Sequence, residues 1–546
     1  MPAPAKSRSG FLRRYPALGL VVAAGALAIL LPSALTVPQS GPSTLAEFAP
    51  VPGAGDGRSD LSDLGAAQSG GLGFGSASGS GGGVIDEPPQ GGAPKQIQPR
   101  LKRCVGDPPR QTEDPLSAPC VAFFTGDNFG ATSKGVTRDE VTVILWRETQ
   151  QATDPKIGNV YDCAAPISPE DDQADLPCKA YMKYFNDRYQ TYGRKVHFWV
   201  AHNTAHAELE DRFKPFASIY QGQPSRKTIV ATYLGTSRKA YQSSAPYYIG
   251  WWPDIEDQMR MSATFICQKL KGRPAQHAGD LLIRNQTRKF GLWWATKQKR
   301  DVLVAELKTQ CDLTLDYESQ ESGATDTRAK AAAFSNAGVT TLISQLGSTE
   351  LITATTFASQ NGYFPEWFFP GGNSQSGIDT NRQGRQPNQA QWANAFGISF
   401  DYRRDAIRDQ TWYRAFREGC PDCPDPTNAG IAYAHYDQFT LLFWGIQAAG
   451  PRLTPENLDR GLHAIPQRGS SDPYKPAAYF APGNYSFIKD SMAMWWDPSG
   501  QPPDATGTGC YRLPNLGRRF RAGDWLAGDD DVKQAGQPCQ GDTSFV

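Results

Sequence analysis

Residues 126–146 read GDNFGATSKGVTRDEVTVILW, a glycine-rich loop followed by an apolar run. Glycines, hydroxyls and one lysine suggest a phosphate-binding loop. Such a loop needs a strand before it and a helix after it, so that backbone N–H groups and the helix dipole converge on the anion. Here the run 141–149 comes after the loop, and its length and continuous apolar character predict a buried strand. The stretch therefore predicts where the first sheet begins, with its glycines in turns and Lys134 solvated.

Strands and helices alternate from this point onward. The predicted strands are 141–149, 195–202, 226–234, 246–250, 288–295, 311–319, 339–347 and 365–372. The predicted helices are 175–193, 207–222, 253–272, 296–310, 324–338, 349–362, about 429–450, and one that begins at Thr454. Repeated strand–helix–strand units imply parallel sheets covered by helices, and two rounds of the rhythm imply two lobes. The expected fold class is α/β, with two Rossmann-like lobes joined by a hinge.

The N-terminus predicts export. An apolar run at 15–37, interrupted by Pro32, follows four basic residues, Lys6, Arg8, Arg13 and Arg14. This arrangement is typical of a secretory signal or of an uncleaved anchor whose N-terminus stays in the cytoplasm. Because Pro32-Ser33-Ala34 is a poor cleavage site, we favour an anchored protein on the outer face of the cytoplasmic membrane over a secreted one.

A linker is expected next. Glycine and serine fill 12 of the 15 positions in SGGLGFGSASGSGGG, residues 69–83, which is the composition of a flexible coil. The predicted divisions are a signal or anchor (1–37), a linker (38–100), a part mainly in the first lobe (101–287), a part mainly in the second (288–430), and crossover helices with a disulfide-bonded C-terminal segment (431–546).

The ten cysteines agree with export, since an even number in an oxidising compartment predicts disulfides. Connectivity is open from the sequence, but sequence neighbours pair naturally: Cys104–Cys120, Cys163–Cys178, Cys267–Cys311, Cys420–Cys423 and Cys510–Cys539. Cys420-Pro-Asp-Cys423 could also be a metal or redox motif. It lacks a second ligand pair nearby, and its prolines predict a stiff turn, so a structural disulfide is favoured.

Charge and composition exclude some functions. The chain has 55 basic and 55 acidic residues, and it carries no motif for nucleic-acid binding, so no nucleic-acid partner is expected. Its thirteen tryptophans suit a protein with apolar clefts. No G-x-S-x-G, H-E-x-x-H or Walker pattern is placed for catalysis, so we expect no catalytic residue, no cofactor and no enzyme. His202 and His206 could hold a metal, but capping or solvent exposure is favoured and no metal is expected.

Ligands of open parallel sheets bind outside the carboxyl ends of the strands. In the first lobe these ends carry Arg147, Glu148, His202, Asn203, Tyr233, Thr236, Ser237, Gly250, Trp251 and Trp252. In the second lobe they carry Tyr317, Glu318, Gln345, Ser348, Thr349, Gly371, Asn373 and Ser374. The turns 235–237 and 347–349 could offer backbone N–H groups to an anion, or could equally be ordinary helix caps. The tryptophan pair could line the cleft or belong to the core.

The order of several stretches resembles a known family. These are GATSKGVTRDEVTVILW (130–146), LKGRPAQHAGD (270–280) before RKFGLWW, AGVTTLISQLGSTE (337–350) with FPEWFFPGG, and AYAHYDQFTLLFWGIQAAGPRLTPENL (432–458). From about residue 120 to 470 the chain resembles type I periplasmic solute-binding proteins, the branched-chain amino-acid-binding-protein-like group of ABC transporters. The resemblance implies the type I periplasmic-binding fold, in which two lobes on a three-stranded hinge close on a small solute.

The resemblance also implies site residues. Solute carboxylates are expected at Thr236 and Ser237 and around Gly250-Trp251-Trp252, with further contacts from Tyr317, Gln345, Ser348 and Asn373. Arg147 and Tyr233 complete the predicted ligand-binding set. Amino-acid binders tend to present small hydroxyl residues where this chain has two tryptophans. A larger or aromatic-compatible solute is therefore expected in place of a plain branched-chain amino acid.

Three functions are weighed. The first is a solute receptor that delivers its cargo to an ABC permease, and it is favoured. The second is a sensing ectodomain of the same fold without transport, for which a partner would have to carry the signal. The third is an exported enzyme, which would need a nucleophile and a base at a strand end.

Overall fold

The computed structural model describes residues 105, 109–147, 160–168, 171–202, 206–219, 222, 224, 227–321, 326–371, 380–426, 429–467, 472–504 and 507–543. The chain separates into Met1–Ala93 and Pro94–Val546, and every described residue belongs to the second unit. The predicted anchor (1–37) and linker (38–100) lie outside the described residues. Within the described ranges, no helix has the length and apolar character needed to cross a membrane.

The first lobe is built on six strands in the order β2-β3-β1-β4-β5-β6. Their bounds are β1 (Glu140–Trp146), β2 (Val160–Asp162), β3 (Lys195–Ala201), β4 (Ala217–Ile219), β5 (Ile229–Thr232) and β6 (Tyr248–Gly250). All neighbours are parallel except β2, which is antiparallel to β3 at the edge. Val143 of β1 pairs with both Phe198 and Ala217, and it is fully buried. The predicted strand after the glycine-rich loop is therefore confirmed as a central strand.

The second lobe has an eight-stranded sheet in the order β13-β12-β11-β10-β9-β7-β8, with β14 paired to β12. The bounds are β7 (Phe290–Trp294), β8 (Tyr317–Gln320), β9 (Thr341–Gln345), β10 (Glu366–Phe369), β11 (Ala395–Ser399), β12 (Ser491–Asp497), β13 (Cys510–Arg512) and β14 (Arg519–Phe520). Strands β7–β11 are parallel, and the strands from the C-terminal part of the chain are antiparallel.

Both sheets repeat one strand order. The parallel strands run β3-β1-β4-β5-β6 in the first sheet and β8-β7-β9-β10-β11 in the second. Numbered along the chain, each is the doubly wound order 2-1-3-4-5, whose ligand crevice lies outside the carboxyl ends where the order reverses. The predicted α/β class with two parallel-dominated sheets is confirmed.

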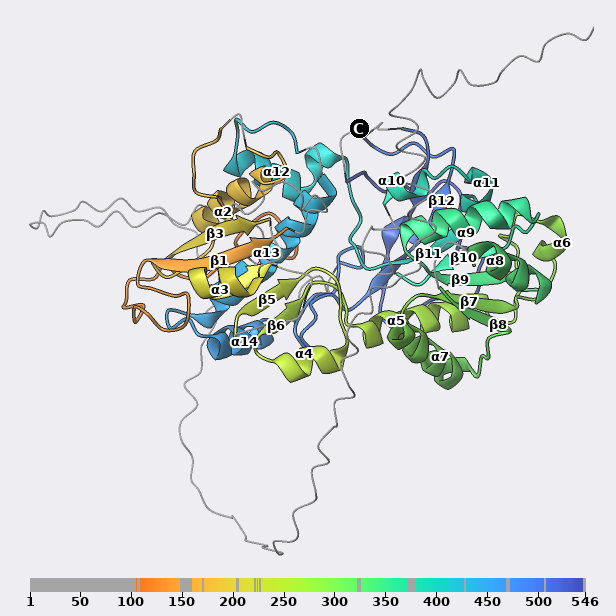
Figure 1. Cartoon of the computed structure of the whole chain (residues 1–546), viewed down its shortest axis with the longest axis horizontal. Helices are drawn as coiled ribbons and strands as arrows, with labels where there is room; N and C mark the ends of the chain where they lie inside the picture. The colour runs from red at the N-terminus through yellow and green to blue at the C-terminus, as the bar shows by residue number, and fades with distance from the viewer. Residues whose placement is uncertain are drawn as a thin grey trace, which may run out of the picture. The chain divides into compact units, whose positions relative to one another are not determined.

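Helices accompany both sheets (Figure 1). With the first sheet lie α2 (Leu176–Arg188), α3 (His206–Phe213), α4 (Arg238–Ser244), η3 (Ile407–Asp409), α12 (Thr411–Gly419), α13 (Ala429–Ala449) and α14 (Pro455–Ala464). With the second lie α5 (Ile255–Phe265), η2 (Ile266–Leu270), α6 (Leu281–Arg284), α7 (Lys297–Cys311), α8 (Thr327–Asn336), α9 (Ser348–Gln360), α10 (Asn381–Gly384), α11 (Gln389–Trp392) and η4 (Pro514–Gly517). Aromatic packing fixes α13, since Phe439 stacks on Phe198 of β3 with ring centroids 4.1 Å apart.

The chain passes between the lobes three times. After β6 it enters α5, which packs against α7, and after β11 it returns to α12, which packs against α2. After α14 it continues into β12 of the second sheet. This third passage runs beside the first, because the N–H of Ile488 donates to the carbonyl of Trp251 at 3.0 Å. The first two passages follow the carboxyl ends of β6 and β11, so the hinge lies beside the expected ligand crevice.

Two predicted elements are wrong in extent. The helix expected at 207–222 stops at Phe213, and Ala217–Ile219 form β4 instead. Pro215 has no N–H to continue a helix, and all three residues of β4 are buried against β1. The strand expected at 311–319 begins only at Tyr317, because Cys311 ends α7 and Asp312 turns the chain with a φ of 50°.

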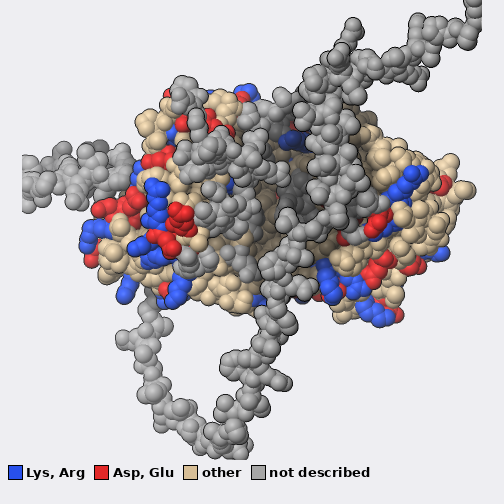
Figure 2. Space-filling model, in the orientation of Figure 1, with Lys and Arg blue, Asp and Glu red and all other residues tan. Residues whose placement is uncertain are grey.

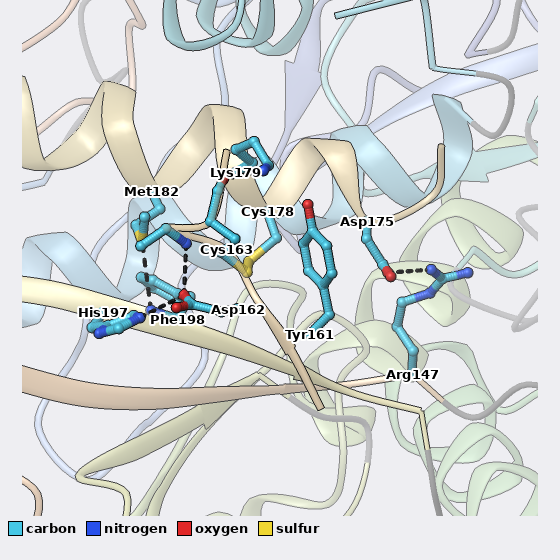
Figure 3. Close-up of a disulfide and its surroundings, with 12 residues drawn as sticks. Arg147, Tyr161, Asp162, Cys163, Asp175, Cys178, Lys179, Met182, His197 and Phe198 are labelled. Atoms are coloured by element: carbon cyan, nitrogen blue, oxygen red, sulfur yellow. Dashed lines mark hydrogen bonds and ion pairs between the residues drawn. A yellow bond between two sulfur atoms is a disulfide. The ribbon is translucent and has the colours of Figure 1, made fainter. Parts of the chain in front are cut away.

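Four of the predicted disulfides are present: Cys163–Cys178, Cys267–Cys311, Cys420–Cys423 and Cys510–Cys539. The first links the end of β2 to α2 with Cα atoms 5.8 Å apart (Figure 3). Cys104, of the fifth predicted pair, lies outside the described residues. These disulfides fit a protein of an oxidising compartment.

Candidate functional site

The carboxyl ends of the two sheets meet at Asp401, two residues after β11. Its Oδ1 accepts hydrogen bonds from the hydroxyl of Tyr233 at 2.9 Å and from Nε1 of Trp252 at 3.0 Å. Tyr233 follows β5 and Trp252 follows β6, so both donors come from the first lobe. One carboxylate of the second sheet therefore receives two donors from the first.

The other oxygen of Asp401 is also bound. Arg404 Nη1 lies 2.8 Å from Oδ2, and the hydroxyl of Tyr433 on α13 lies 3.3 Å from it. The Asp401 and Arg404 side chains are 2% and 1% exposed. A buried carboxylate is tolerated because its charge is paired and its lone pairs are used. We call Tyr233, Trp252, Asp401, Arg404 and Tyr433 the interlobe cluster.

Burial and a nearby charge keep the hydroxyl of Tyr233 protonated. Burial raises the pKa of the Tyr233 hydroxyl well above its usual value, and the Asp401 carboxylate raises it further. The hydroxyl is thus a hydrogen-bond donor at every physiological pH. The rings of Tyr233 and Trp252, with centroids 5.1 Å apart, form an aromatic surface beside the carboxylate.

A second polar group lies at the carboxyl ends of β1 and β3. Arg147 is ion-paired with Asp175 (Figure 3) and lies 3.5 Å from Asp172. His202 Nε2 lies 2.7 Å from the other oxygen of Asp175. The Arg147 side chain keeps 12% exposure. Arg147 follows β1, which with β4 flanks the point where the strand order of the first sheet reverses, and a guanidinium there suits an anionic ligand.

Helix α13 brings two further ionisable side chains to this region. His435 is buried, and its Nδ1 has no partner among the described residues. Burial, with Arg147 nearby, lowers the pKa of His435 to about 3. Asp437 is 1% exposed, and burial raises its pKa well above the usual value, with Asp114 and Asp401 adding to the effect. His435 is therefore neutral at pH 7.

The predicted first-lobe residues have different environments. Tyr233 and Trp252 belong to the interlobe cluster, and Arg147 lies at the strand reversal. Trp251, by contrast, is 1% exposed and packs on Phe487 with ring centroids 5.1 Å apart, so it is a core residue.

The hydroxyl turn is a helix cap. Ser237 Oγ accepts the N–H of Ala240 at 3.1 Å and caps α4, while the carbonyl of Thr236 accepts the N–H of Ile255 at 3.0 Å. Roles for Thr236 and Ser237 as solute ligands stay predictions.

In the second lobe, Tyr317 packs edge-on against Phe334 at 4.9 Å between ring centroids. Gln345 is buried at the end of β9, and its Oε1 has no partner among the described residues. The side chain of Ser348 and all of Asn373 lie outside the described residues, as do Glu148 and Asn203. Gln345 Nε2 lies 3.5 Å from Sδ of Met259, a residue of α5.

The sequence missed Asp401, Arg404, Tyr433, His435 and Asp437 as site residues. Three of them lie in AYAHYDQF, a stretch noticed only for its resemblance. Asp401 follows β11, a strand that the sequence did not predict. The principle that ligands bind at the carboxyl ends of parallel strands therefore could not identify Asp401 as a candidate.

His202, one of the two candidate metal ligands, faces a carboxylate. This residue bonds Asp175, and the side chain of His206 lies outside the described residues. Across the described ranges, no three His, Cys, Asp or Glu side chains are grouped as a metal site.

On the face drawn in Figure 2, basic and acidic side chains are interspersed.

No family model and no curated protein matches the sequence. The structure is similar to that of an ABC transporter substrate-binding protein from Aeropyrum pernix, with 12% identity, 73% of this chain and 100% of that chain covered, and a TM-score of 0.49. It is also similar to a fatty acid ABC transporter substrate-binding protein from Thermomonospora curvata (13% identity, 72% and 97% covered, TM-score 0.48). A third is periplasmic binding protein type 1 from Bordetella pertussis Tohama I (10% identity, 68% and 98% covered, TM-score 0.45).

Proposed function

We propose that this chain is an extracytoplasmic solute-binding receptor whose two lobes close on a small solute and present it to an ABC importer. The observation that supports this proposal is the meeting of the two sheets at Asp401, which follows β11. Its carboxylate accepts hydrogen bonds from Tyr233, which follows β5, and from Trp252, which follows β6. Two lobes with the same strand order and three passages between them suit hinged closure. An N-terminal anchor would keep the receptor at the membrane surface.

The chemistry of the site favours an amino-acid-like or larger solute with a polar or aromatic body. Tyr233, Trp252 and Tyr433 offer aromatic surface with hydrogen-bonding tips, and Arg147 offers a cation for a carboxylate. The buried Oε1 of Gln345 offers an acceptor from the second lobe. These residues provide binding chemistry, and we propose no reaction for them.

The test is a screen of a metabolite library for solutes that raise the melting temperature of the purified full chain. A solute that binds only the folded state at 100 times its Kd stabilises it by about 2.7 kcal/mol. The paired variants Trp252→Phe and Trp251→Phe then locate the site. Trp252→Phe keeps a ring but removes the donor to Asp401, and we expect it to reduce the affinity for a solute found in the screen about tenfold.

Trp251→Phe changes a neighbouring core tryptophan in the same way and should leave that affinity within about twofold. No stabilising solute in the library would contradict the receptor function. Equal effects of the two variants would contradict the location of the site, and turnover of a bound solute would favour an enzyme.

A further inference from the structure

The carboxylate of Asp175 lies between two basic side chains at the carboxyl ends of β1 and β3. Its Oδ1 accepts a hydrogen bond from Nη1 of Arg147, which follows β1 (Figure 3). Its Oδ2 lies 2.7 Å from Nε2 of His202, which follows β3. The Asp175 side chain is 3% exposed, whereas that of Arg147 keeps 12% exposure. One buried carboxylate therefore holds a guanidinium that solvent can still reach.

Asp175 stands at the N-cap of α2, but it does not cap the helix. An aspartate in this position commonly accepts an N–H of the first helical turn. The carboxylate of Asp175 accepts no such bond from the described first turn, since its two oxygens face Arg147 and His202 instead. The side chain thus serves the residues at the strand ends and not its own helix.

The backbone around Asp175 is tied to β3. Cys178, in the first turn of α2, is disulfide-bonded to Cys163, which directly follows β2 (Figure 3). The N–H of Cys178 donates to the carbonyl of Asp175 at 3.0 Å. Strand β2 in turn pairs with β3, the strand that ends at His202. The start of α2 and the end of β3 are therefore joined, and Asp175 and His202 are held in a fixed relation.

Arg147 keeps donors for a ligand. In the described part of the chain, its bonds to Asp175 and Asp172 all use Nη1. A guanidinium has five N–H groups, so those of Nε and Nη2 remain. Such an edge can bind a carboxylate through two parallel hydrogen bonds. Asp172 is 56% exposed, so solvent screens its charge and weakens its competition with a ligand.

We propose that Asp175 and His202 are positioning residues, which hold Arg147 so that its Nε and Nη2 bind a carboxylate of the solute. The inference rests on the proposed receptor function and narrows its solutes to those with a free carboxylate. An arginine side chain has many rotamers, and ordering it at the moment of binding costs affinity. Asp175 orders Arg147 before the solute arrives.

The experiment titrates the full chain by calorimetry with benzoate, phenylacetate and 3-phenylpropionate, each beside its uncharged primary amide. Their aromatic bodies suit the rings of Tyr233 and Trp252. At least one carboxylate is expected to bind, and its amide to bind at least about tenfold more weakly, because it lacks the charge. Failure of all three carboxylates to bind, or equal binding of the amides, would overturn the inference.

The variants Asp175→Ala and Asp172→Ala separate positioning from charge. Each removes one negative charge close to Arg147, so charge alone would make both variants bind the carboxylate more tightly. If Asp175 positions Arg147, Asp175→Ala instead weakens carboxylate binding about tenfold, while Asp172→Ala leaves it unchanged or up to about twofold tighter. Tighter binding by Asp175→Ala would show that Asp175 does not act by positioning.

A pair of histidines gives a second test. His202→Ala should weaken carboxylate binding about threefold, and His202→Gln, which keeps an N–H for Asp175, should restore it. His197 is the matched control, because its Nε2 also lies 2.7 Å from an aspartate, Asp162, and its side chain is 14% exposed against 15% for His202. His197→Ala should leave carboxylate binding unchanged. Equal effects of His202→Ala and His197→Ala would overturn the role of His202, and this pair still decides if Asp175→Ala does not fold.

Failure of this inference differs from failure of the receptor function. A solute without a carboxylate, found in the library screen and bound equally by the parent chain and Asp175→Ala, would overturn the inference and leave the receptor standing. The absence of any stabilising solute in the library would contradict the receptor itself.

Discussion

At the scale of single residues, Asp401 has the most demanding environment. Its carboxylate is almost fully buried, and it accepts hydrogen bonds from Tyr233, Trp252, Tyr433 and Arg404. Removing one partner of a buried ion pair costs more than the pair contributes, because the remaining charge stays in a medium of low polarity. Asp401 therefore holds together donors that come from different lobes.

Asp401→Asn is expected to lower the free energy of unfolding by about 3–5 kcal/mol, because the buried Arg404 guanidinium loses its carboxylate. Denaturant unfolding followed by tryptophan fluorescence measures the change. The double variant Asp401→Asn/Arg404→Met serves as the control and should recover part of the loss. A double variant as unstable as the single one would contradict the charge-pairing explanation.

At the scale of elements, the short helix α4 shows how a cap can resemble a ligand site. Ser237 precedes α4 with an extended backbone, and its Oγ accepts the N–H of Ala240, three residues on. The same hydroxyl and N–H groups could have received a solute carboxylate, which is why the sequence left both possibilities open. In the structure, the Ser237 hydroxyl already serves the helix.

Ser237→Ala should lower the free energy of unfolding by about 1 kcal/mol, as loss of a cap does, and Ser237→Asn should restore it. Thermal unfolding of the two variants beside the parent chain measures this. If Ser237→Asn keeps the stability but abolishes binding of a solute found in the screen, Ser237 contacts solute as well as capping α4.

At the scale of the whole molecule, α13 carries ionisable groups into the core of the first lobe. His435 is held neutral, since its pKa is lowered to about 3 from an ordinary value near 6.5. A histidine with a lowered pKa in the folded state stabilises fully above the unfolded pKa, and this stabilisation is lost as pH falls below it. Acid should therefore weaken the folded chain through this residue between pH 6.5 and about 3.

The difference in stability between the parent chain and His435→Asn isolates this effect from other titrating groups. Above pH 6.5 the difference should be constant, and below it the parent should lose about 1.4 kcal/mol more per pH unit. Denaturant unfolding at pH 7.5, 6.5, 5.5 and 4.5 gives the slope. Parallel pH profiles for the two proteins would show that His435 is not kept neutral by the fold.

The sequence by itself determined the strand-and-helix rhythm and the α/β class. Continuous apolar runs such as 141–149 specify central strands because both faces of a parallel sheet are buried. Local chemistry also placed the cap at Thr454, where Oγ1 accepts the N–H of Asn457 at 3.2 Å. These features depend on neighbours within a few residues, so the order of residues contains the necessary information.

Only the tertiary structure brings the residues of the interlobe cluster together. Asp401 is 168 residues from Tyr233 and 149 from Trp252, and no local pattern joins them. The adjacent tryptophans were equivalent in sequence, yet Trp251 packs into the core on Phe487 while Trp252 donates to Asp401. Which of the two reaches the second lobe depends on how the two sheets are placed, and the residues around the pair do not set that placement.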